Sequence, residues 1–313
     1  MNVWRIHLKN DIDANHTRND LIEYCFKESL IGVGWPKVTI RTNNAAELKE
    51  DCLANYGQKS GSAGFKALNA KRKMEVNDLI WSYIKEKSEY YLCRVTDTWI
   101  NSIPSDTNKC LDISNYVNVE WLKIGLEQNV PGKVINSFRP NASAQQIHGV
   151  EDISKFLWNK YAKEKLYKFK NSPDANLWLL FSPEEIEELV LLYLQVEKHY
   201  FVYTSTAKAT TKTFECLLVD EKGKYAYPQV KSGKVTLNAS DFEYLLQYEP
   251  SSIVILFSES ESYILNNANQ SRFVCLTKKE IETFIKKKSN LLPKTILEKT
   301  ELLEEILHST SGN

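Results

Sequence analysis

Two polar residues stand two positions apart in a stretch that otherwise reads as a β-strand, YAYPQVKSG at residues 225–233. Gln229 and Lys231 share one face of that strand, because successive side chains of a strand point to opposite faces. An amide oxygen can bind a hard cation such as Mg²⁺, and an ammonium group can stabilise the negative charge that develops during phosphodiester cleavage. The pair therefore indicates metal-dependent phosphate chemistry near the end of this strand.

The second half of the chain contains the elements that would position this pair. A helix is predicted from Pro183, because Ser182 is a good N-cap, proline suits the first helical position, and Glu184 and Glu185 favour the positive end of the helix dipole. Three predicted strands follow, in YFVYTST, TFECLLVD and KYAYPQVKSG, and then a helix in SDFEYLLQY capped by Ser240, a buried strand in SSIVILFS and a capped helix in TKKEIETFIKKK. The predicted order is α-β-β-β-α-β-α.

Glu215 is the acidic residue that this order brings closest to Gln229. It lies in TFECLLVD, which is joined to the strand of Gln229 by the short turn DEKGK. Such a turn favours antiparallel pairing, and facing side chains on paired strands are close enough to share one ion. We therefore expect Glu215 and Gln229 to bind the same cation.

This half resembles the core of the PD-(D/E)xK nuclease superfamily, and most of all its Mrr-like and other modification-dependent restriction endonucleases. The resemblance implies that Glu187 on the first helix, Glu215 and Gln229 bind Mg²⁺ or Mn²⁺, and that these three residues and Lys231 are catalytic. Family spacing in EELVLLYL favours Glu187 over its neighbour Glu188. Two positions depart from the family, with Glu in place of Asp at 215 and Gln in place of the usual acid at 229. One carboxylate fewer weakens metal binding, so loss of catalysis is an alternative.

Two stretches are candidates for contacts with a nucleic-acid backbone. TSTAKATTK, between the first two strands of the second half, carries Lys208 and Lys212 among hydroxyl groups, a composition found both at phosphates and in plain turns. NYGQKSGSAGFKALNAKRK, residues 55–73, reads as a loop or a short basic helix and ends in Lys71, Arg72 and Lys73. A solvated loop is an equally good interpretation of the second stretch.

The first half reads as mostly β. MEVNDLIWSYIKEKSEYYLCRVTDTW predicts two strands joined by a charged hairpin, and VPGKVINSFRP continues the β pattern with a Pro-Gly turn. This segment resembles the PUA superfamily, especially its EVE-type members, over about residues 1–145. The resemblance implies a small β-barrel that holds a flipped or modified base between aromatic walls. Trp35, Trp81 and Trp99 are the wall candidates, with core packing as the alternative for each, and Asp78 or Asn77 could contact the base edge.

Length and composition indicate two domains without a membrane span. The 313 residues exceed what one core usually serves, and the boundary is expected in the helical pattern EDISKFLWNKYAKEKL and the turn NSPDA. We predict a reader domain at 1–150, a helical linker at 151–181 and a nuclease-like domain at 182–313. Forty basic and 40 acidic residues balance, so net charge neither supports nor excludes DNA binding. Six cysteines without a CxxC pair or a close His partner suggest neither a zinc site nor a disulfide framework and are expected to be core thiols. The N-terminus lacks a leader pattern, which predicts a cytoplasmic protein.

The sequence as a whole predicts an α+β or α/β protein with two functions. A PUA-like β-barrel with helices would recognise a modified base, and a restriction-endonuclease-like αβββαβ core would hydrolyse double-stranded DNA with Mg²⁺ or Mn²⁺ in defence against phage or foreign DNA. A homodimer is one possible assembly. Two alternatives remain at this point: a nuclease fold that has lost catalysis and only binds DNA, and an RNA-binding PUA protein that takes part in RNA processing.

Overall fold

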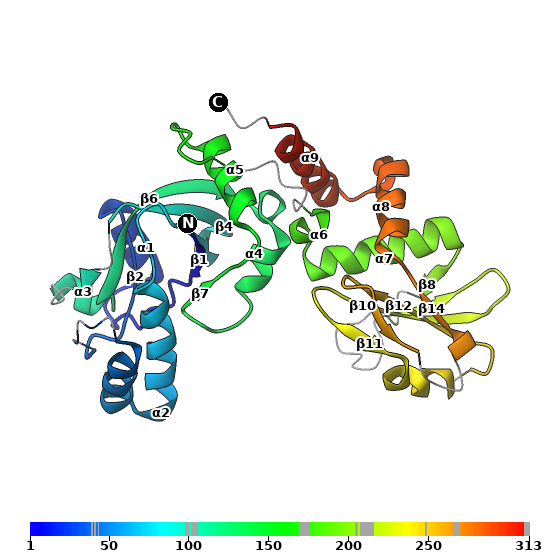
Figure 1. Cartoon of the computed structure of the whole chain (residues 1–313), viewed down its shortest axis with the longest axis horizontal. Coiled ribbons are helices and arrows are strands. Elements are labelled where there is room, and N and C mark those ends of the chain that lie inside the picture. Colours follow the sequence, from blue (N-terminus) through cyan, green and yellow to red (C-terminus); the bar gives the residue numbers. More distant parts are fainter. Residues whose placement is uncertain are drawn as a thin grey trace. The chain divides into compact units, whose positions relative to one another are not determined.

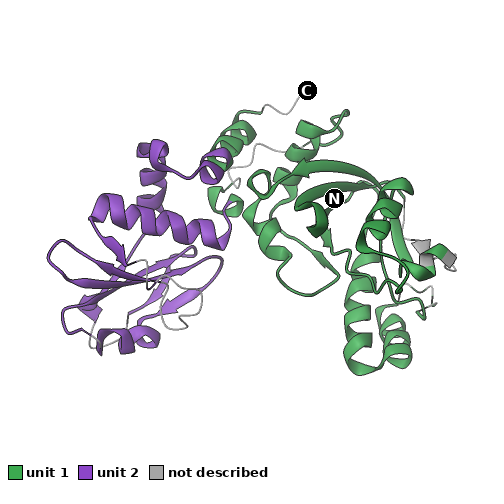
Figure 2. Cartoon of the chain, turned by 180° about the vertical axis from the view of Figure 1, so that it is seen from behind, with its two compact units in different colours: residues 1–180, 299–313 green, residues 181–298 purple. Residues whose placement is uncertain are grey.

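The computed structural model describes residues 1–38, 40, 42, 44–97, 100–101, 106–168, 176–203, 206, 216–247, 249–265 and 270–309. The chain divides into two compact units (Figure 2). Unit 1 comprises residues 1–180 and 299–313, and unit 2 comprises residues 181–298. Both units mix helices and strands, in agreement with the α+β prediction.

Unit 1 is built on one large sheet. Its strands are β1 (Val3–Ile6), β2 (Leu30–Val33), β3 (Leu79–Ile84), β4 (Glu89–Val95), β5 (Ile100–Asn101), β6 (Asn115–Gly125) and β7 (Ala144–Gln146). Its helices are α1 (Arg18–Lys27), α2 (Ala45–Lys71), α3 (Asp106–Cys110), α4 (Gly132–Ser137), α5 (Glu151–Tyr161) and α6 (Leu177–Leu180), with short 3₁₀ turns at Lys85–Lys87 and Glu127–Asn129. The strand order is β2-β6-β4-β3-β1-β7, with β5 added beside β6. The sheet is curled (Figure 1), and its ladder stays open between β2 and β7 over the described residues.

The predicted charged hairpin is confirmed as the centre of this sheet. β3 and β4 pair antiparallel from Leu79 with Arg94 to Ile84 with Glu89, and β1 adds a parallel neighbour to β3. Because successive side chains of a strand point to opposite faces, the apolar residues of this hairpin lie in two different cores. Ile80 and Cys93 lie in the core on one face of the sheet, and Trp81 lies in the core on the other face.

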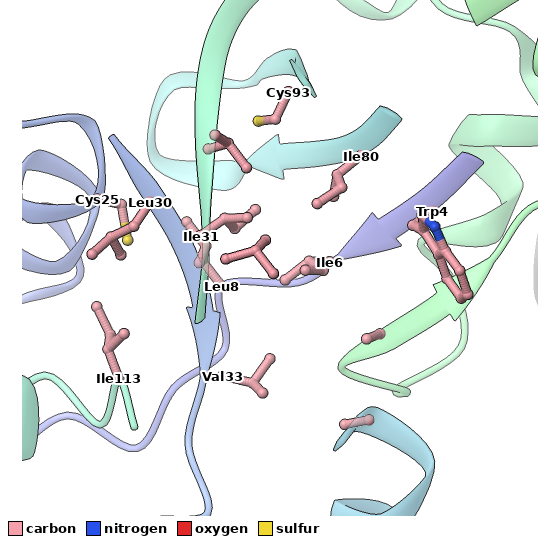
Figure 3. Packing of buried hydrophobic residues seen from close by; sticks show 14 of the residues in the cluster. Trp4, Ile6, Leu8, Cys25, Leu30, Ile31, Val33, Ile80, Cys93 and Ile113 are labelled. Carbon is pink, nitrogen blue, oxygen red and sulfur yellow. The ribbon is translucent and has the colours of Figure 1, made fainter. Parts of the chain in front are cut away.

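The core that contains Ile80 also contains cysteines, among them Cys25 and Cys93 (Figure 3). Cys25, Cys52 and Cys93 are buried there, and Cys216 is buried in unit 2, so the core-thiol prediction is confirmed for these four. All six cysteines of the chain are present as thiols. Burial raises the pKa of the Cys25 thiol to about 12, which keeps it protonated and unreactive at neutral pH.

Two sequence predictions for unit 1 are wrong. The loop interpretation of residues 55–73 is wrong and the helix interpretation is confirmed, because α2 extends from Ala45 to Lys71, with two helical segments meeting at Gly57, where φ is +70°. The VPGKVINSFRP stretch contains the helix α4 rather than a strand. Its Pro131 precedes the first helical residue, a position in which proline's missing N–H costs no hydrogen bond.

Unit 2 contains a second sheet between helices. Its strands are β8 (Phe201–Tyr203), β9 (Leu217–Val219), β10 (Tyr225–Lys231), β11 (Thr236–Asn238), β12 (Ile253–Ser258), β13 (Ser262–Ile264) and β14 (Phe273–Cys275). Its helices are α7 (Pro183–Lys198), α8 (Lys278–Lys287), the 3₁₀ helices η4 (Ala239–Gln247), η5 (Gln270–Arg272) and η6 (Ser289–Leu291), and the first turn of α9 (Lys294–His308), whose later residues belong to unit 1.

The five-stranded sheet of unit 2 has the order β14-β12-β10-β9-β8. β8, β9 and β10 are consecutive antiparallel neighbours, and β12 and β14 continue the sheet parallel to β10. α7 covers one face, and η4 packs on the other (Figure 1). All four predicted strands and both predicted terminal helices are confirmed, while the small parallel pair of β11 and β13 was not predicted.

Three helix starts in unit 2 were predicted to be capped by a side chain, and the predicted cap is present at two of them. The hydroxyl of Ser182 accepts a hydrogen bond from Glu185 N, and Ser182 N donates to the Glu185 carboxylate, which makes a complete capping box. Thr277 and Glu280 repeat this arrangement at α8. The Ser240 prediction is wrong, because the side chain of Asn238 accepts a hydrogen bond from Ser240 N at the start of η4.

The segment expected to link two domains belongs to unit 1 by its packing. Ile153, Leu157 and Trp158 of α5 lie in the same core as Trp81, and Trp81 Nε1 donates to Ser154 Oγ at 3.0 Å. Leu302 and Ile306 from the end of α9 belong to this core as well. Within the described part of the chain, no helix has an apolar stretch long enough to cross a bilayer.

Candidate functional site

β10 carries the Gln229–Lys231 pair on one face, as predicted. The strand runs to Lys231 and pairs residue by residue with β12, so that Gln229 lies beside Leu256 and Lys231 beside Ser258. Gln229 is 5% exposed, and its Nε2 donates to Pro228 O at 2.7 Å. This bond leaves the amide Oε1 as the atom of Gln229 that can bind a cation.

The end of β10 is fixed by a carboxylate that sequence analysis did not single out. Glu259 directly follows β12, and its backbone N donates to Lys231 O at 2.9 Å. Its side chain accepts a hydrogen bond from the backbone N of Gly233, which has a φ of +76°. A residue with a Cβ is strained at this φ, which explains the Ser-Gly sequence of the turn. Because parallel strands end at the same edge of a sheet, this edge brings Glu259 close to the Lys231 backbone.

Glu187 comes from another element, the helix α7. Gln229 and Lys231 share the face of Tyr227, whose core cluster contains Leu245 and other residues of η4 and none from α7. α7 packs on the opposite face of this sheet (Figure 1). That Glu187 binds the same metal as Gln229 stays a prediction. Helical periodicity gave the position of Glu187 on α7, but it could not show which face of the sheet α7 covers.

Several predicted site residues lie outside the described residues: Glu215, Lys208, Lys212 and Trp99.

The basic residues at the end of α2 are not one exposed strip. Lys71 is fully buried, and its Nζ has no hydrogen-bond partner. Burial lowers the pKa of Lys71 well below its usual value. Arg72 donates to Asn69 Oδ1 at 2.7 Å, and Lys73 is exposed. The prediction that Lys71 contacts a nucleic-acid backbone is therefore wrong for this structure, and only Lys73 faces solvent freely enough for such a contact.

Two predicted base contacts are part of the protein core. Trp81 is 0% exposed and hydrogen-bonded to Ser154, so neither face of its indole is accessible. Asp78 is 1% exposed and accepts hydrogen bonds from Trp4 Nε1 at 2.8 Å and from the backbone N of Asn2. These hydrogen bonds hold the N-terminus against the start of β3. Trp81 and Asp78 therefore have structural roles.

Trp35 and Asn77 also make local contacts. Trp35 is half-buried and lies so close to α2 that a Cβ added at Gly64 would be 2.6 Å from its Nε1. Asn77 has a φ of +70°, and its side chain accepts from Arg94 Nη1 at 3.0 Å. Neither residue lines the cavity of unit 1 described next.

Unit 1 contains a cavity of about 530 Å³ with an aromatic floor and a charged rim. The rings of Tyr83, Tyr90 and Phe138 line it and contact one another. The centroids of Tyr83 and Tyr90, which face each other across the β3–β4 hairpin, are 4.6 Å apart, and those of Tyr90 and Phe138 are 5.9 Å apart. The lining also includes His7, Leu8, Lys9, Arg18, Ile22, Ile84, Lys85, Glu86, Ile135 and Arg139.

The charge around this cavity is predominantly positive. Lys9, Arg18, Lys85 and Arg139 line it, with Glu86 as the opposing carboxylate. Arg18 is held in place by hydrogen bonds from its Nη1 to Leu8 O and Asn10 O, each 3.0 Å long. A rim of this composition favours an anionic ligand such as a phosphate group.

His7 is the titratable group of the cavity wall. It is 6% exposed, packs edge-on against Phe138 with centroids 4.9 Å apart, and its Nε2 has no hydrogen-bond partner. Burial, and then the positive charges of Arg5 and Lys9, lower the pKa of His7 to about 4. The imidazole is therefore neutral at pH 7, and Nε2 is a polar atom that a ligand could engage.

Some of the residues that line this cavity could have been identified from the sequence. Tyr83 lies on the same strand face as Trp81, two residues closer to the predicted hairpin turn, so alternation could have identified it. Phe138 and Arg139 could not be found in this way, because their segment was assigned to β-structure and not to α4 and the loop after it.

Comparison of the chain with protein-family models, with curated proteins and with solved structures finds no match.

Proposed function

We propose that this protein binds modified double-stranded DNA through the cavity of unit 1. The observation that carries the proposal is the combination of a floor of three aromatic rings with a rim of four cations and one carboxylate. An extruded base can stack on aromatic rings with about 1–3 kcal/mol per base, while the cations bind the flanking phosphates. A curled sheet with a base-binding cavity is the arrangement that the PUA-like resemblance implies.

We propose further that unit 2 cleaves the bound DNA with Mg²⁺ or Mn²⁺. Gln229 supplies a neutral oxygen ligand, Glu215 a carboxylate, and Lys231 the cation that stabilises the charge of the transition state. The antiparallel register of β9 and β10, with Val219 beside Tyr225, supports this grouping, because the proposal requires position 215 to face position 229. The meander β8–β10 followed by the parallel β12 is the strand arrangement that an αβββαβ core needs.

A DNA-binding protein without cleavage activity is the second candidate. It is favoured by the composition of the metal set proposed on β9 and β10, in which Gln229 is an amide where the PD-(D/E)xK family has an acid. A site with one carboxylate and one amide binds Mg²⁺ weakly compared with a site that has several carboxylates. Addition of Mn²⁺ to the protein with and without Gln229→Ala distinguishes the candidates, because only a working site has a metal affinity that depends on Gln229.

The test of the reader function is a binding comparison between matched duplexes. Fluorescently labelled DNA of one sequence, with and without modified bases, is titrated with the full-length protein at a fixed salt concentration, since phosphate contacts make affinity salt-dependent. Tyr83→Ala should weaken binding to the preferred modified duplex by about 1–3 kcal/mol and change binding to plain DNA much less. Tyr161→Ala is the control, because Tyr161 is an exposed ring outside the cavity. Equal losses for both variants would contradict the assignment.

A further inference from the structure

Three side chains of metal-binding type form a cluster in unit 1, away from the cavity of that unit. One ligand atom from each of Asp13, His16 and Cys110 lies within 4.8 Å of the other two. His16 Nδ1 and Asp13 Oδ1 are 2.6 Å apart. All three residues are half-buried, so the cluster is open to solvent on one side. The cluster joins the segment before α1 to the last residue of α3.

The backbone holds the two segments in this arrangement without using the ligand atoms. Asp13 N donates to Cys110 O at 2.9 Å, which fixes two of the three ligands relative to each other. Two residues further along, Asp112 accepts a hydrogen bond from Asp11 N at 2.9 Å, and its backbone O accepts one from Asn10 Nδ2 at 2.8 Å. A ligand set that is already assembled loses little conformational freedom when a metal binds.

The third ligand is fixed from the other side. His16 N donates to Asp13 O at 3.3 Å, which closes a turn, and Thr17 directly after it caps α1 in a complete capping box with Asp20.

We propose that Asp13, His16 and Cys110 bind Zn²⁺, with solvent in the fourth position. A thiolate, an imidazole and a carboxylate are the ligands that tetrahedral Zn²⁺ takes in proteins, whereas Mg²⁺ prefers oxygen ligands alone. On binding, the Cys110 thiol releases its proton to solvent and a neutral imidazole nitrogen of His16 binds the metal, so the affinity falls as the pH is lowered. This site is separate from the Mg²⁺ or Mn²⁺ site proposed in unit 2.

The bound ion would connect the start of α1 to the end of α3. Because it binds the folded form of unit 1, Zn²⁺ stabilises that unit by mass action. The inference does not depend on the proposed DNA function, since its readouts are metal binding and thermal stability.

Cobalt substitution in the full-length protein tests the site. After removal of metals with a chelator, Co²⁺ is added in steps and the absorption spectrum is recorded. We expect one equivalent to bind with a thiolate-to-cobalt charge-transfer band, Zn²⁺ to abolish the band by displacement, and Zn²⁺ to raise the thermal midpoint of unit 1 by several degrees. Cys110→Ser should lose the band, and His16→Gln should weaken Co²⁺ binding at least about tenfold, because even the loss of a residue that only orients a metal ligand typically costs about 10–100-fold in affinity.

The matched control is Cys275→Ser, which removes another half-buried thiol outside the cluster. This variant should keep the band and the thermal shift. Circular dichroism at equal concentration verifies that each variant is folded, and Asp13→Asn gives an independent variant with an unchanged thiol. Absence of stoichiometric binding, or a band that persists in Cys110→Ser or disappears in Cys275→Ser, would overturn the proposal.

Discussion

Lys231 is the residue on which the proposed cleavage chemistry depends most. Its ammonium group is assigned to the transition state, so Lys231→Ala should reduce metal-dependent cleavage at least about 100-fold while folding and DNA binding persist. The assay compares purified variant and wild type on phage DNA with Mg²⁺ or Mn²⁺. Lys234→Ala is the control, because Lys234 is exposed in the turn after β10. Similar cleavage by Lys231→Ala and wild type would remove Lys231 from the site.

His7 should make unit 1 sensitive to acid. Its pKa is about 4 in the folded protein and about 6.5 in an unfolded chain, so the unfolded state binds a proton first as the pH falls. The contribution of neutral His7 to the stability of unit 1 is therefore complete above about pH 6.5. It is lost as the pH falls from about 6.5 to 4. Asp112 acts in the opposite direction, because burial raises its pKa to about 6 and its ionisation costs stability as the pH rises.

The variant His7→Gln separates these two effects. The free energy of unfolding is measured at pH 7 and pH 5 for the variant and the wild type. We expect His7→Gln to lose less stability than the wild type on acidification, since glutamine does not titrate. If both proteins lose the same amount, His7 is not the group responsible.

At the scale of single elements, the stability of helix α7 depends on its capping box. Ser182→Ala removes the acceptor for Glu185 N and should lower the stability of unit 2 by about 1 kcal/mol. Urea unfolding monitored by tryptophan fluorescence and circular dichroism measures the change. Ser240→Ala is the comparison, because Asn238 provides the acceptor at the start of η4 and the Ser240 side chain is exposed. A larger loss for Ser240→Ala would contradict this account of the caps.

The elements of unit 2 could be predicted because their signals are local. Ser182 and Thr277 mark helix starts, and the apolar run of β12 marks a buried strand; each signal lies within a few residues of its effect. In α2 a loop was an equally good interpretation because glycines are typical of loops, although one of them, Gly64, is needed for the close approach of Trp35.

The candidate sites were less predictable from the sequence than the elements, because they depend on which face of a helix or strand packs against which other element. Period-2 alternation placed Gln229 and Lys231 on one face, but no local pattern shows that α7 covers the other face or that Trp81 is covered by α5. The approach of Cys110 to His16 is a contact between residues far apart in the sequence. Such contacts are set by the sheet and its connections, and a single sequence does not report them.

At the scale of the molecule, the division into units differs from the predicted boundary at residue 150. A fragment that ends there would lack Ile153, Leu157 and Trp158 and would expose the core around Trp81. Exposed apolar surface of this kind promotes aggregation. We therefore expect residues 1–150 to be poorly folded, in contrast to the reader domain that the sequence predicts for this range.

Unit 2 is the better candidate for an independent fragment. Residues 181–298 include all five strands of the second sheet together with α7 and α8. We expect this fragment to fold and to cleave, if it is active, without regard to modification, because the aromatic cavity belongs to unit 1. Cleavage confined to modified DNA by the fragment alone would assign recognition to unit 2.

The most direct test of the account is cleavage of matched duplexes by the full-length protein. Two DNA molecules of identical sequence, one plain and one carrying modified bases, are incubated with the protein and Mn²⁺ at one salt concentration, over a panel of modifications. The account predicts that at least one modified duplex is cut, that its plain counterpart is not, and that Tyr83→Ala abolishes this preference. Equal cleavage of plain and modified DNA, or a preference that Tyr83→Ala leaves unchanged, would contradict it.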